Sequence, residues 1–277
     1  KNAFIFFPLI FSGKLFQPVP AVNCMITFLG FCLVASGLYI LNDYLDRHKD
    51  RLHPRKANRP LAQREIGKSA ISLIISGFIG IGLLVCWQVD SLVLATALVY
   101  IILHFVYNFF AKKIVIIDVV FIALGFQIRI WAGAMAAQVY PSVWLQMCVF
   151  LLALFLGFTK RRYEMKTLGE HAVHHRNVLS HYTVYLLDQI IIICSTLTIV
   201  FYGLYAMSPD IVNRIGSQDM VYSVVFVIYG IFRYLYVSHV KKRGDDAGEI
   251  LASDLPLLVN VLLWILYICY LLYNPLR

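Results

Sequence analysis

The stretch PAVNCMITFLGFCLVASGLYIL, residues 20–41, is an almost unbroken run of apolar side chains. It is directly followed by NDYLDRHKDRLHPRKANRP, residues 42–60, which holds eleven charged or histidine side chains in nineteen positions of a chain that is only 14% charged. An apolar run of about 20 residues is long enough to cross a bilayer as a helix. The sequence therefore predicts a membrane-spanning helix that ends in a highly charged segment.

The whole chain is unusually apolar. Of its 277 residues 60% are hydrophobic, and its mean hydropathy is +0.75, whereas soluble proteins have roughly 45–50% apolar residues. Eight runs are long enough to span a membrane: residues 20–41, 69–89, 91–110, 114–137, 142–160, 184–207, 218–238 and 253–273. A shorter run, Asn2 to Ser12, contains Pro8 and is expected to form a truncated or re-entrant ninth helix.

These runs predict an all-α integral membrane protein with about nine transmembrane helices. No linker or low-complexity tract divides the chain, so we expect one membrane-embedded domain over residues 1–277. Because the chain begins with Lys1 and not with Met, we also expect natural N-terminal residues to be missing.

The basic residues predict the orientation in the membrane. Eighteen of the twenty-four Lys and Arg fall in four connections, at residues 47–68, 112–113, 160–176 and 241–243. These are alternate connections and so share one side of the membrane, which the positive-inside rule makes cytoplasmic. The net charge of +9 is then mostly a matter of topology, although it also suits an anionic substrate or lipid.

Several functional classes find no support in the sequence. The six cysteines lie singly within apolar runs without a CxxC pair, which supports neither a disulfide framework nor a zinc site. There is no GxxxxGK[ST] loop, no GxGxxG after a strand and no nucleic-acid-binding module. We therefore expect no nucleic-acid partner.

The acids of the charged segment are regularly spaced. Asp43, Asp46 and Asp50 lie at i, i+3 and i+7, which places three carboxylates on one face of a helix. Like charges so placed repel one another unless a cation lies among them. Magnesium prefers one or two carboxylates together with substrate phosphates, and Asn42 can add a neutral ligand or cap the helix. The spacing predicts a Mg2+ site.

Bases follow these acids directly. His53, Arg55, Lys56 and Arg59 come next, with Pro54 and Pro60 to stiffen the turn. Cationic groups beside a magnesium site are what a diphosphate requires on its other side. The alternative is a solvated loop that only sets the topology, which explains the bases but not the three aligned acids.

Asn42, Asp43, Asp46 and Asp50 match NDxxDxxxD, the signature of the UbiA superfamily of intramembrane prenyltransferases. NRPLAQREI at 58–66 resembles the segment that follows this signature there. AKKIVIIDVVFIALGFQIRIWAGA at 111–134 is also similar, and its matching positions are Lys112, Asp118, Arg129 and Gly133. The resemblance implies a UbiA-like helical bundle with its active site on the cytoplasmic side.

One departure indicates a branch of that superfamily. The second motif, DxxxD, corresponds here to TKRRYEMKTLGEHAVHHRNVLSHYT at 159–183, which contains no aspartate. Its polar residues resemble the KRxxE…R…Y pattern of the decaprenyl-phosphate phosphoribosyltransferases: Lys160, Arg161, Arg162, Tyr163, Glu164, Arg176 and Tyr182. HPxK at 53–56 and GDDAGEILASDLPLL at 244–258 resemble the same branch.

The resemblance implies transfer of 5-phosphoribose from phosphoribosyl diphosphate to a polyprenyl (decaprenyl) phosphate, with release of pyrophosphate. Mg2+ is expected on Asp43, Asp46 and Asp50, and Lys160 and Arg161 complete the expected catalytic set. The expected substrate-binding residues are Asn42, His53, Lys56, Arg59, Lys112, Arg129, Arg162, Tyr163, Glu164, Arg176 and Tyr182. The branch also implies a bacterial plasma membrane and a product used for a cell-wall arabinan precursor.

Some alternatives stay open at this stage. Arg129 either contacts a substrate phosphate or pairs with a group such as Asp118, and Lys112 either binds substrate or only sets topology. A UbiA-type prenyltransferase using a prenyl diphosphate and a small acceptor is the second function, although its DxxxD motif is missing. A transporter is the third, although its helices lack a path of ionisable residues. Lipid length and homo-oligomerisation are undetermined.

Overall fold

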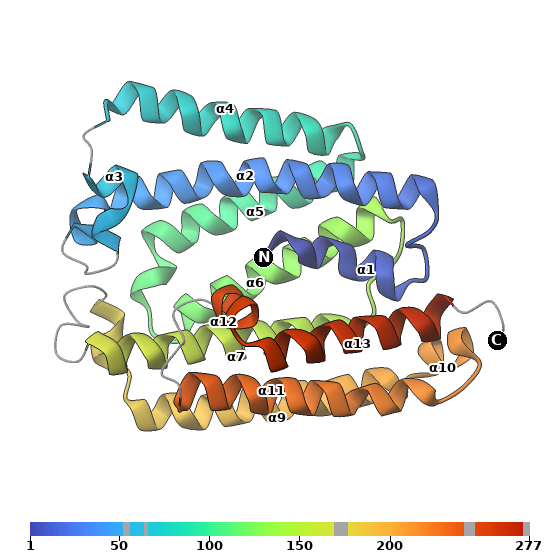
Figure 1. Cartoon of the computed structure of the whole chain (residues 1–277). Helices are drawn as coiled ribbons and strands as arrows, with labels where there is room; N and C mark the ends of the chain where they lie inside the picture. Colours follow the sequence, from blue (N-terminus) through green and yellow to red (C-terminus); the bar gives the residue numbers. More distant parts are fainter. Residues whose placement is uncertain (52–55, 64–65, 169–176, 241–246, 274–277) are drawn as a thin grey trace. The chain divides into compact units, whose positions relative to one another are not determined.

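The structure, a computed structural model, describes residues 1–51, 56–63, 66–168, 177–240 and 247–273 (Figure 1). The described chain falls into two compact units. The first consists of Lys1–Pro141 and Glu170–His181, and the second of Ser142–Gly169 and Tyr182–Arg277, each as far as it is described. The expectation of one domain over the whole chain stays a prediction.

The first unit contains the short N-terminal helices and four long helices. Its elements are η1 (Asn2–Ile5), α1 (Phe6–Phe11), α2 (Pro18–Asp50), η2 (Lys56–Asn58), α3 (Pro60–Gln63), α4 (Lys68–Trp87), α5 (Ser91–Phe109), η3 (Ala111–Lys113), α6 (Ile117–Ala136) and η5 (Asn177–His181). The second unit contains α7 (Val143–Leu168), α9 (Val184–Ala206), α10 (Pro209–Ile215), η6 (Asp219–Ser223), α11 (Val224–His239), α12 (Ala247–Ser253) and α13 (Leu255–Tyr273).

The apolar runs form helices as predicted. Within the described residues, eight helices are long and apolar enough to cross a membrane. The ninth run, Asn2–Phe11, is helical but short, because a span needs about 20 residues. The all-α fold is confirmed, while an exact count of nine spans is not.

Helix α2 continues well beyond its apolar part. It runs without a break from Pro18 to Asp50, so the charged residues at positions 43–50 prolong the same helix. A helix of 33 residues is about 50 Å long, which exceeds the roughly 30 Å of a hydrocarbon core. The last turns of α2 thus extend past the apolar segment and carry the three aspartates.

Glycines let α4 approach α2 closely, and the two helices lie side by side (Figure 1). A Cβ atom on Gly82 would lie 2.8 Å from the carbonyl oxygen of Gly30 and 2.9 Å from the backbone nitrogen of Val34. Small residues are favoured where membrane helices approach to backbone contact. This contact fixes α4 against the helix that carries the acids.

The second unit is held by polar contacts as well as by apolar packing. The Tyr202 hydroxyl on α9 pairs with the Ser223 hydroxyl of η6 at 2.7 Å and accepts a hydrogen bond from Trp264 Nε1 of α13 at 2.9 Å. Arg233 of α11 donates to both oxygens of Asp254, at 2.8 and 3.0 Å. These bonds join α9, η6, α11 and α13.

Gly82→Ala tests the close contact. We expect a loss of about 1–3 kcal/mol of stability from overpacking, because the atoms that the new methyl group meets belong to the backbone and cannot rotate away. Gly80→Ala on the same helix is the control, since nothing lies within 4 Å of its Cβ position. Thermal unfolding in detergent should show a lower melting temperature for Gly82→Ala alone; equal melting temperatures would contradict the assignment.

Candidate active site

The three aspartates form a row along the last turns of α2. Asp50 is buried, with 5% of its surface exposed, whereas Asp43 and Asp46 are half-buried. Asn42, at the start of the row, is also half-buried. The predicted helical spacing is therefore present, and it brings carboxylates together in a partly dehydrated region, where their mutual repulsion is stronger than in water.

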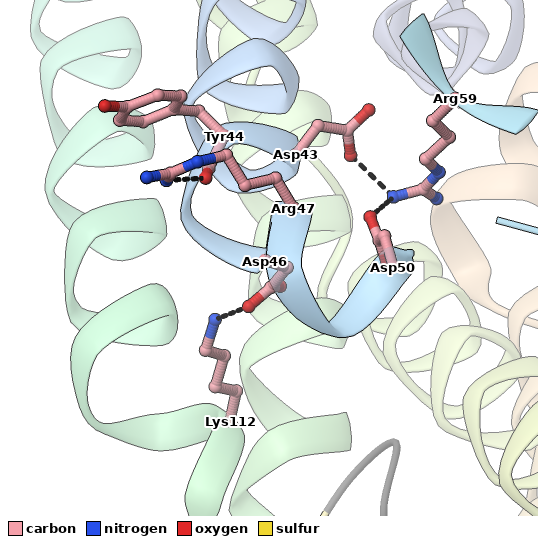
Figure 2. A network of polar contacts seen from close by, with 7 residues as sticks. All are labelled: Asp43, Tyr44, Asp46, Arg47, Asp50, Arg59 and Lys112. Atoms are coloured by element: carbon pink, nitrogen blue, oxygen red, sulfur yellow. Dashed lines mark hydrogen bonds and ion pairs between the residues drawn. The ribbon is translucent and has the colours of Figure 1, made fainter. Parts of the chain in front are cut away.

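Arg59 lies between two of these carboxylates. Its Nη1 donates to Asp43 Oδ1 at 2.6 Å and to Asp50 Oδ2 at 2.9 Å (Figure 2). One cationic nitrogen thus occupies the point between two carboxylates that are two turns apart on α2. The third carboxylate is neutralised separately, because Lys112 Nζ donates to Asp46 Oδ1 at 2.9 Å.

The chain after α2 folds back so that Arg59 reaches Asp43. Arg51 Nε donates to the carbonyl oxygen of Ala62 at 2.8 Å, which fastens α3 to the end of α2. Arg47 has a local role, since it donates to the carbonyl oxygen of Tyr44 at 2.7 Å and lies over the Tyr44 ring. Arg59 thus reaches the acid row from the segment that follows α2.

Lys112 comes from a different part of the first unit. It lies on η3, immediately after α5, and η3 packs against η5. The pair Lys112–Asp46 joins positions 66 residues apart, which spacing along the sequence could not reveal. Its predicted role toward substrate stays a prediction, but the structure places it at the site.

The predicted basic row lies on the last turns of α7, in the second unit. Arg161, with only 1% of its surface exposed, donates from Nη1 to Glu164 Oε2 at 2.9 Å. Arg162 is also buried and donates from Nε to Asp188 Oδ1 on α9. Buried charges are costly unless they are paired, and both arginines are paired within their own unit.

The remaining predicted residues of this unit surround that row. Lys160 and Tyr163 are half-buried on α7, and both belong to the polar end of the helix. Tyr182 is buried and packs edge-on against the ring of Phe158. Tyr182 therefore lies beside α7, and its contact with substrate stays a prediction.

Arg129 is held by protein groups deep in the first unit. It is 3% exposed and donates to Asn2 Oδ1 at 2.8 Å, to the carbonyl oxygen of Gly125 at 2.6 Å and to the Tyr100 hydroxyl at 2.6 Å. These three hydrogen bonds join η1, α5 and α6. This arrangement favours a packing role over the phosphate contact, which stays a prediction.

For three of the predicted residues the structure does not describe the side chain. His53 and Arg176 lie outside the described residues. Lys56 belongs to η2, but its side chain lies outside them as well. Their predicted contacts with phosphate stay predictions.

Sequence reasoning missed Asp188 and Arg233, while Asp254 lies within the segment 244–258 already singled out for its resemblance. Asp188 contacts Arg162 and lies 3.6 Å from His239 Nε2, and Arg233 pairs with Asp254. A signal was present, because Asp188 and Arg233 are the single acidic or basic residues (Asp, Glu, Lys, Arg) of runs 184–207 and 224–239. A charge within an apolar membrane segment generally has a partner or a function.

The acid row suits a magnesium ion. Within the described residues, His, Cys, Asp and Glu do not converge in groups of three that could hold a metal. However, two carboxylate oxygens already lie within 2.9 Å of one point, the Arg59 Nη1 position. Hard oxygen ligands of this kind, with room for substrate phosphates, are what Mg2+ prefers. Asp43 and Asp50 would hold the ion once Arg59 moves, and Asp46 would contribute from the adjacent turn.

Comparison with known proteins decides the family. The model of the UbiA prenyltransferase family matches residues 5–248. The chain belongs to this family. UbiA members are integral membrane proteins of helical bundles, and the eight apolar helices agree with that class.

Two curated relatives of this UbiA chain are named decaprenyl-phosphate phosphoribosyltransferase. The one from Mycolicibacterium smegmatis is 29% identical over 253 residues, which cover 88% of this chain and 79% of that protein. The one from Corynebacterium glutamicum is 28% identical over 282 residues, which cover 99% and 83%.

Solved structures share the fold. A UbiA homolog from Archaeoglobus fulgidus bound to GPP and Mg2+ superposes with a TM-score of 0.70 at 18% identity, covering 98% of this chain and 96% of that one. At this identity the likeness establishes the fold alone. It agrees with the all-α architecture expected from the sequence.

Arg59→Gln tests the bridge between the two carboxylates. Without Arg59, Asp43 and Asp50 lose the cation that bridges them, so we expect the melting temperature in EDTA to fall by a few degrees, corresponding to about 1–3 kcal/mol for lost bonds to a charged group. Added Mg2+ should restore most of the loss and bind more tightly than to the wild type, because it displaces no cation.

The matched control is Arg47→Gln. It also removes one positive charge, from α2 itself, but Arg47 donates to the carbonyl oxygen of Tyr44 and not to the acids. It should respond to Mg2+ as the wild type does. A magnesium response that is identical in all three proteins would show that Arg59 does not occupy the metal position.

Proposed function

We propose that this protein transfers 5-phosphoribose from phosphoribosyl diphosphate to a polyprenyl phosphate, decaprenyl phosphate in the relatives' case, and releases pyrophosphate in a Mg2+-dependent reaction. The observation that carries the proposal is that α2 bears an aspartate row, while α7 bears two buried arginines and a lysine where the family's second DxxxD motif would stand. The first set suits a metal-bound diphosphate, and the second suits phosphate groups without a metal.

The residues of α2 act on the diphosphate of the sugar substrate. Asp43, Asp46 and Asp50 would hold Mg2+, which would supply positive charge for the departing pyrophosphate. Arg59, freed from its two carboxylates, lies within reach of the same diphosphate and donates hydrogen bonds to it. Lys112 keeps Asp46 oriented through the 2.9 Å ion pair.

The residues of α7 act on the lipid phosphate. Lys160 supplies a half-buried cation, while Arg161 and Arg162 are held in place by Glu164 and Asp188. A guanidinium group can bind a phosphate in two-point geometry. Cations in place of the second DxxxD motif fit an acceptor that is a monophosphate nucleophile.

The reaction needs no general base. A lipid phosphate oxygen, already ionised near neutral pH, attacks C1 of the ribose; the new C1–O bond forms as the C1–O bond to pyrophosphate breaks. Both bonding electrons leave with the pyrophosphate. The protein then contributes by holding the two anionic substrates together and by stabilising the charge on the oxocarbenium-like state and the leaving group.

The names of the two curated relatives support this choice of substrates. Bacterial relatives and the distribution of basic residues support a bacterial plasma membrane with the site on the cytoplasmic side. The missing DxxxD motif argues against the alternative, a transferase that uses a prenyl diphosphate and a small acceptor, although the structural neighbour bound to GPP and Mg2+ belongs to the same fold.

The first experiment incubates purified protein with Mg2+, labelled phosphoribosyl diphosphate and decaprenyl phosphate, and follows the label into the organic phase. Transfer that stops in EDTA is the expected result. Consumption of a prenyl diphosphate against an aromatic acceptor, without transfer of phosphoribose, would favour the alternative. Asp43→Ala is expected to reduce transfer by about 10²–10³-fold, and normal turnover of this variant would exclude Asp43 as a metal ligand.

Lys160→Ala tests the assignment of the lipid phosphate to α7. We expect KM for decaprenyl phosphate to rise about tenfold or more, with a much smaller change in KM for phosphoribosyl diphosphate, because a cation that binds one substrate is lost. Lys166→Ala is the control, since Lys166 is exposed on the same helix. Equal effects of both variants would show that Lys160 acts only through the net charge of the protein.

A further inference from the structure

Asn108 is a buried amide for which the structure supplies no partner. Only 3% of its surface is exposed, and neither Nδ2 nor Oδ1 has a hydrogen-bond partner in the structure as described. Buried side-chain amides are nearly always hydrogen-bonded, since an unsatisfied polar group costs about 1–3 kcal/mol. Asn108 therefore calls for a partner that is not part of the described chain.

The position of Asn108 follows from the inner face of α5. The buried residues of this helix are Val93, Ala97, Tyr100 and Asn108, which recur at intervals of three, four and eight and so share one face. His104 continues that face, and its ring contacts those of Tyr100 and Tyr39, with centroid distances of 4.4 and 6.3 Å. Since Tyr39 lies on α2, the face that carries Asn108 is turned toward α2.

Two contacts fix the register between α2 and the chain of α5 and η3. Tyr39 meets His104, and about two turns farther along both segments Asp46 meets Lys112. Asn108 lies one turn after His104, so it is level with the residues one turn after Tyr39, which are Asn42 and Asp43. In this register the unpartnered amide lies level with the beginning of the acid row.

The chemistry of the amide limits what it can bind. A phosphate offers only acceptors, which would satisfy Nδ2 alone, and a metal ion would satisfy Oδ1 alone. A hydroxyl group both donates and accepts, so a pair of neighbouring hydroxyls can satisfy both atoms at once. On the proposed function, the one such diol that enters this site belongs to the ribose, whose attached diphosphate is held by the adjacent acids.

We propose that the Asn108 amide binds the ribose hydroxyls of phosphoribosyl diphosphate, accepting through Oδ1 and donating through Nδ2. This inference rests on the proposed function and adds the residue that selects a pentosyl diphosphate over a prenyl diphosphate. A prenyl chain has no hydroxyl at that place and would leave both amide atoms unsatisfied, and a site built for hydroxyls discriminates strongly against substrates that lack them.

Asn108→Leu tests the proposal, because leucine has a similar volume and no polar atom. We expect the Kd for phosphoribosyl diphosphate in the presence of Mg2+, measured by thermal protection, to rise about tenfold or more, as expected for lost hydrogen bonds. The Kd for pyrophosphate with Mg2+ should not change, since pyrophosphate has no ribose. The melting temperature without ligand should stay equal or rise, because an unsatisfied amide is removed.

Thr27→Val is the matched control. Thr27 is equally buried and its hydroxyl also lacks a partner in the described chain, but it lies about 24 Å before Asp43 along the same helix. It should leave both Kd values unchanged. Asn108→Asp, which keeps the acceptors but replaces the donors by a charge, should weaken binding of both ligands through repulsion of phosphate.

The outcomes separate this inference from the proposed function. Equal weakening of pyrophosphate and phosphoribosyl diphosphate in Asn108→Leu would assign Asn108 to the diphosphate or metal and overturn the ribose contact. A lower melting temperature with unchanged Kd would make it a packing residue. If the wild type binds no phosphoribosyl diphosphate but binds prenyl diphosphate, the proposed function itself is wrong, and this inference with it.

Discussion

The repulsion among three carboxylates on one face of α2 is the constraint on which the first unit depends. Asp43, Asp46 and Asp50 share a partly buried helix end, where their charges cannot be left to solvent alone. Arg59 and Lys112 form ion pairs with these carboxylates, each from a different segment. Arg59 and the element η3 are thereby held beside the row. The repulsion among the carboxylates thus determines which groups pack at the end of the helix.

The same arrangement connects stability with function. A cation between Asp43 and Asp50 stabilises the fold when no metal is bound, and it stands at the point where a metal would bind. On the proposed function, exchange of Arg59 for Mg2+ would keep the two carboxylates neutralised and would release a guanidinium beside the incoming diphosphate. On the same proposal, the amide of Asn108 on α5 would find its hydrogen-bond partner in the bound substrate.

In the second unit the buried charges that require compensation are positive. Its α7 end carries buried cations, and Glu164 and Asp188 compensate Arg161 and Arg162 without a metal. Aspartates at these positions would themselves need a divalent ion. On the proposed function, bases in place of acids on α7 would suit a lipid monophosphate, while the helical fold is shared with the UbiA homolog of known structure.

The sequence by itself determined the helices and the acid row. Apolar runs of about 20 residues have no stable alternative to a helix in a membrane, and the i, i+3, i+7 spacing of Asp43, Asp46 and Asp50 fixes their common face. Only the tertiary structure decided the partners. Lys112 on Asp46, Arg162 on Asp188, Arg129 on Asn2 and Tyr100, and the unsatisfied amide of Asn108 all depend on which helices pack together and in which register. That choice rests on contacts between residues far apart in sequence, such as Gly30 with Gly82, which no local periodicity encodes.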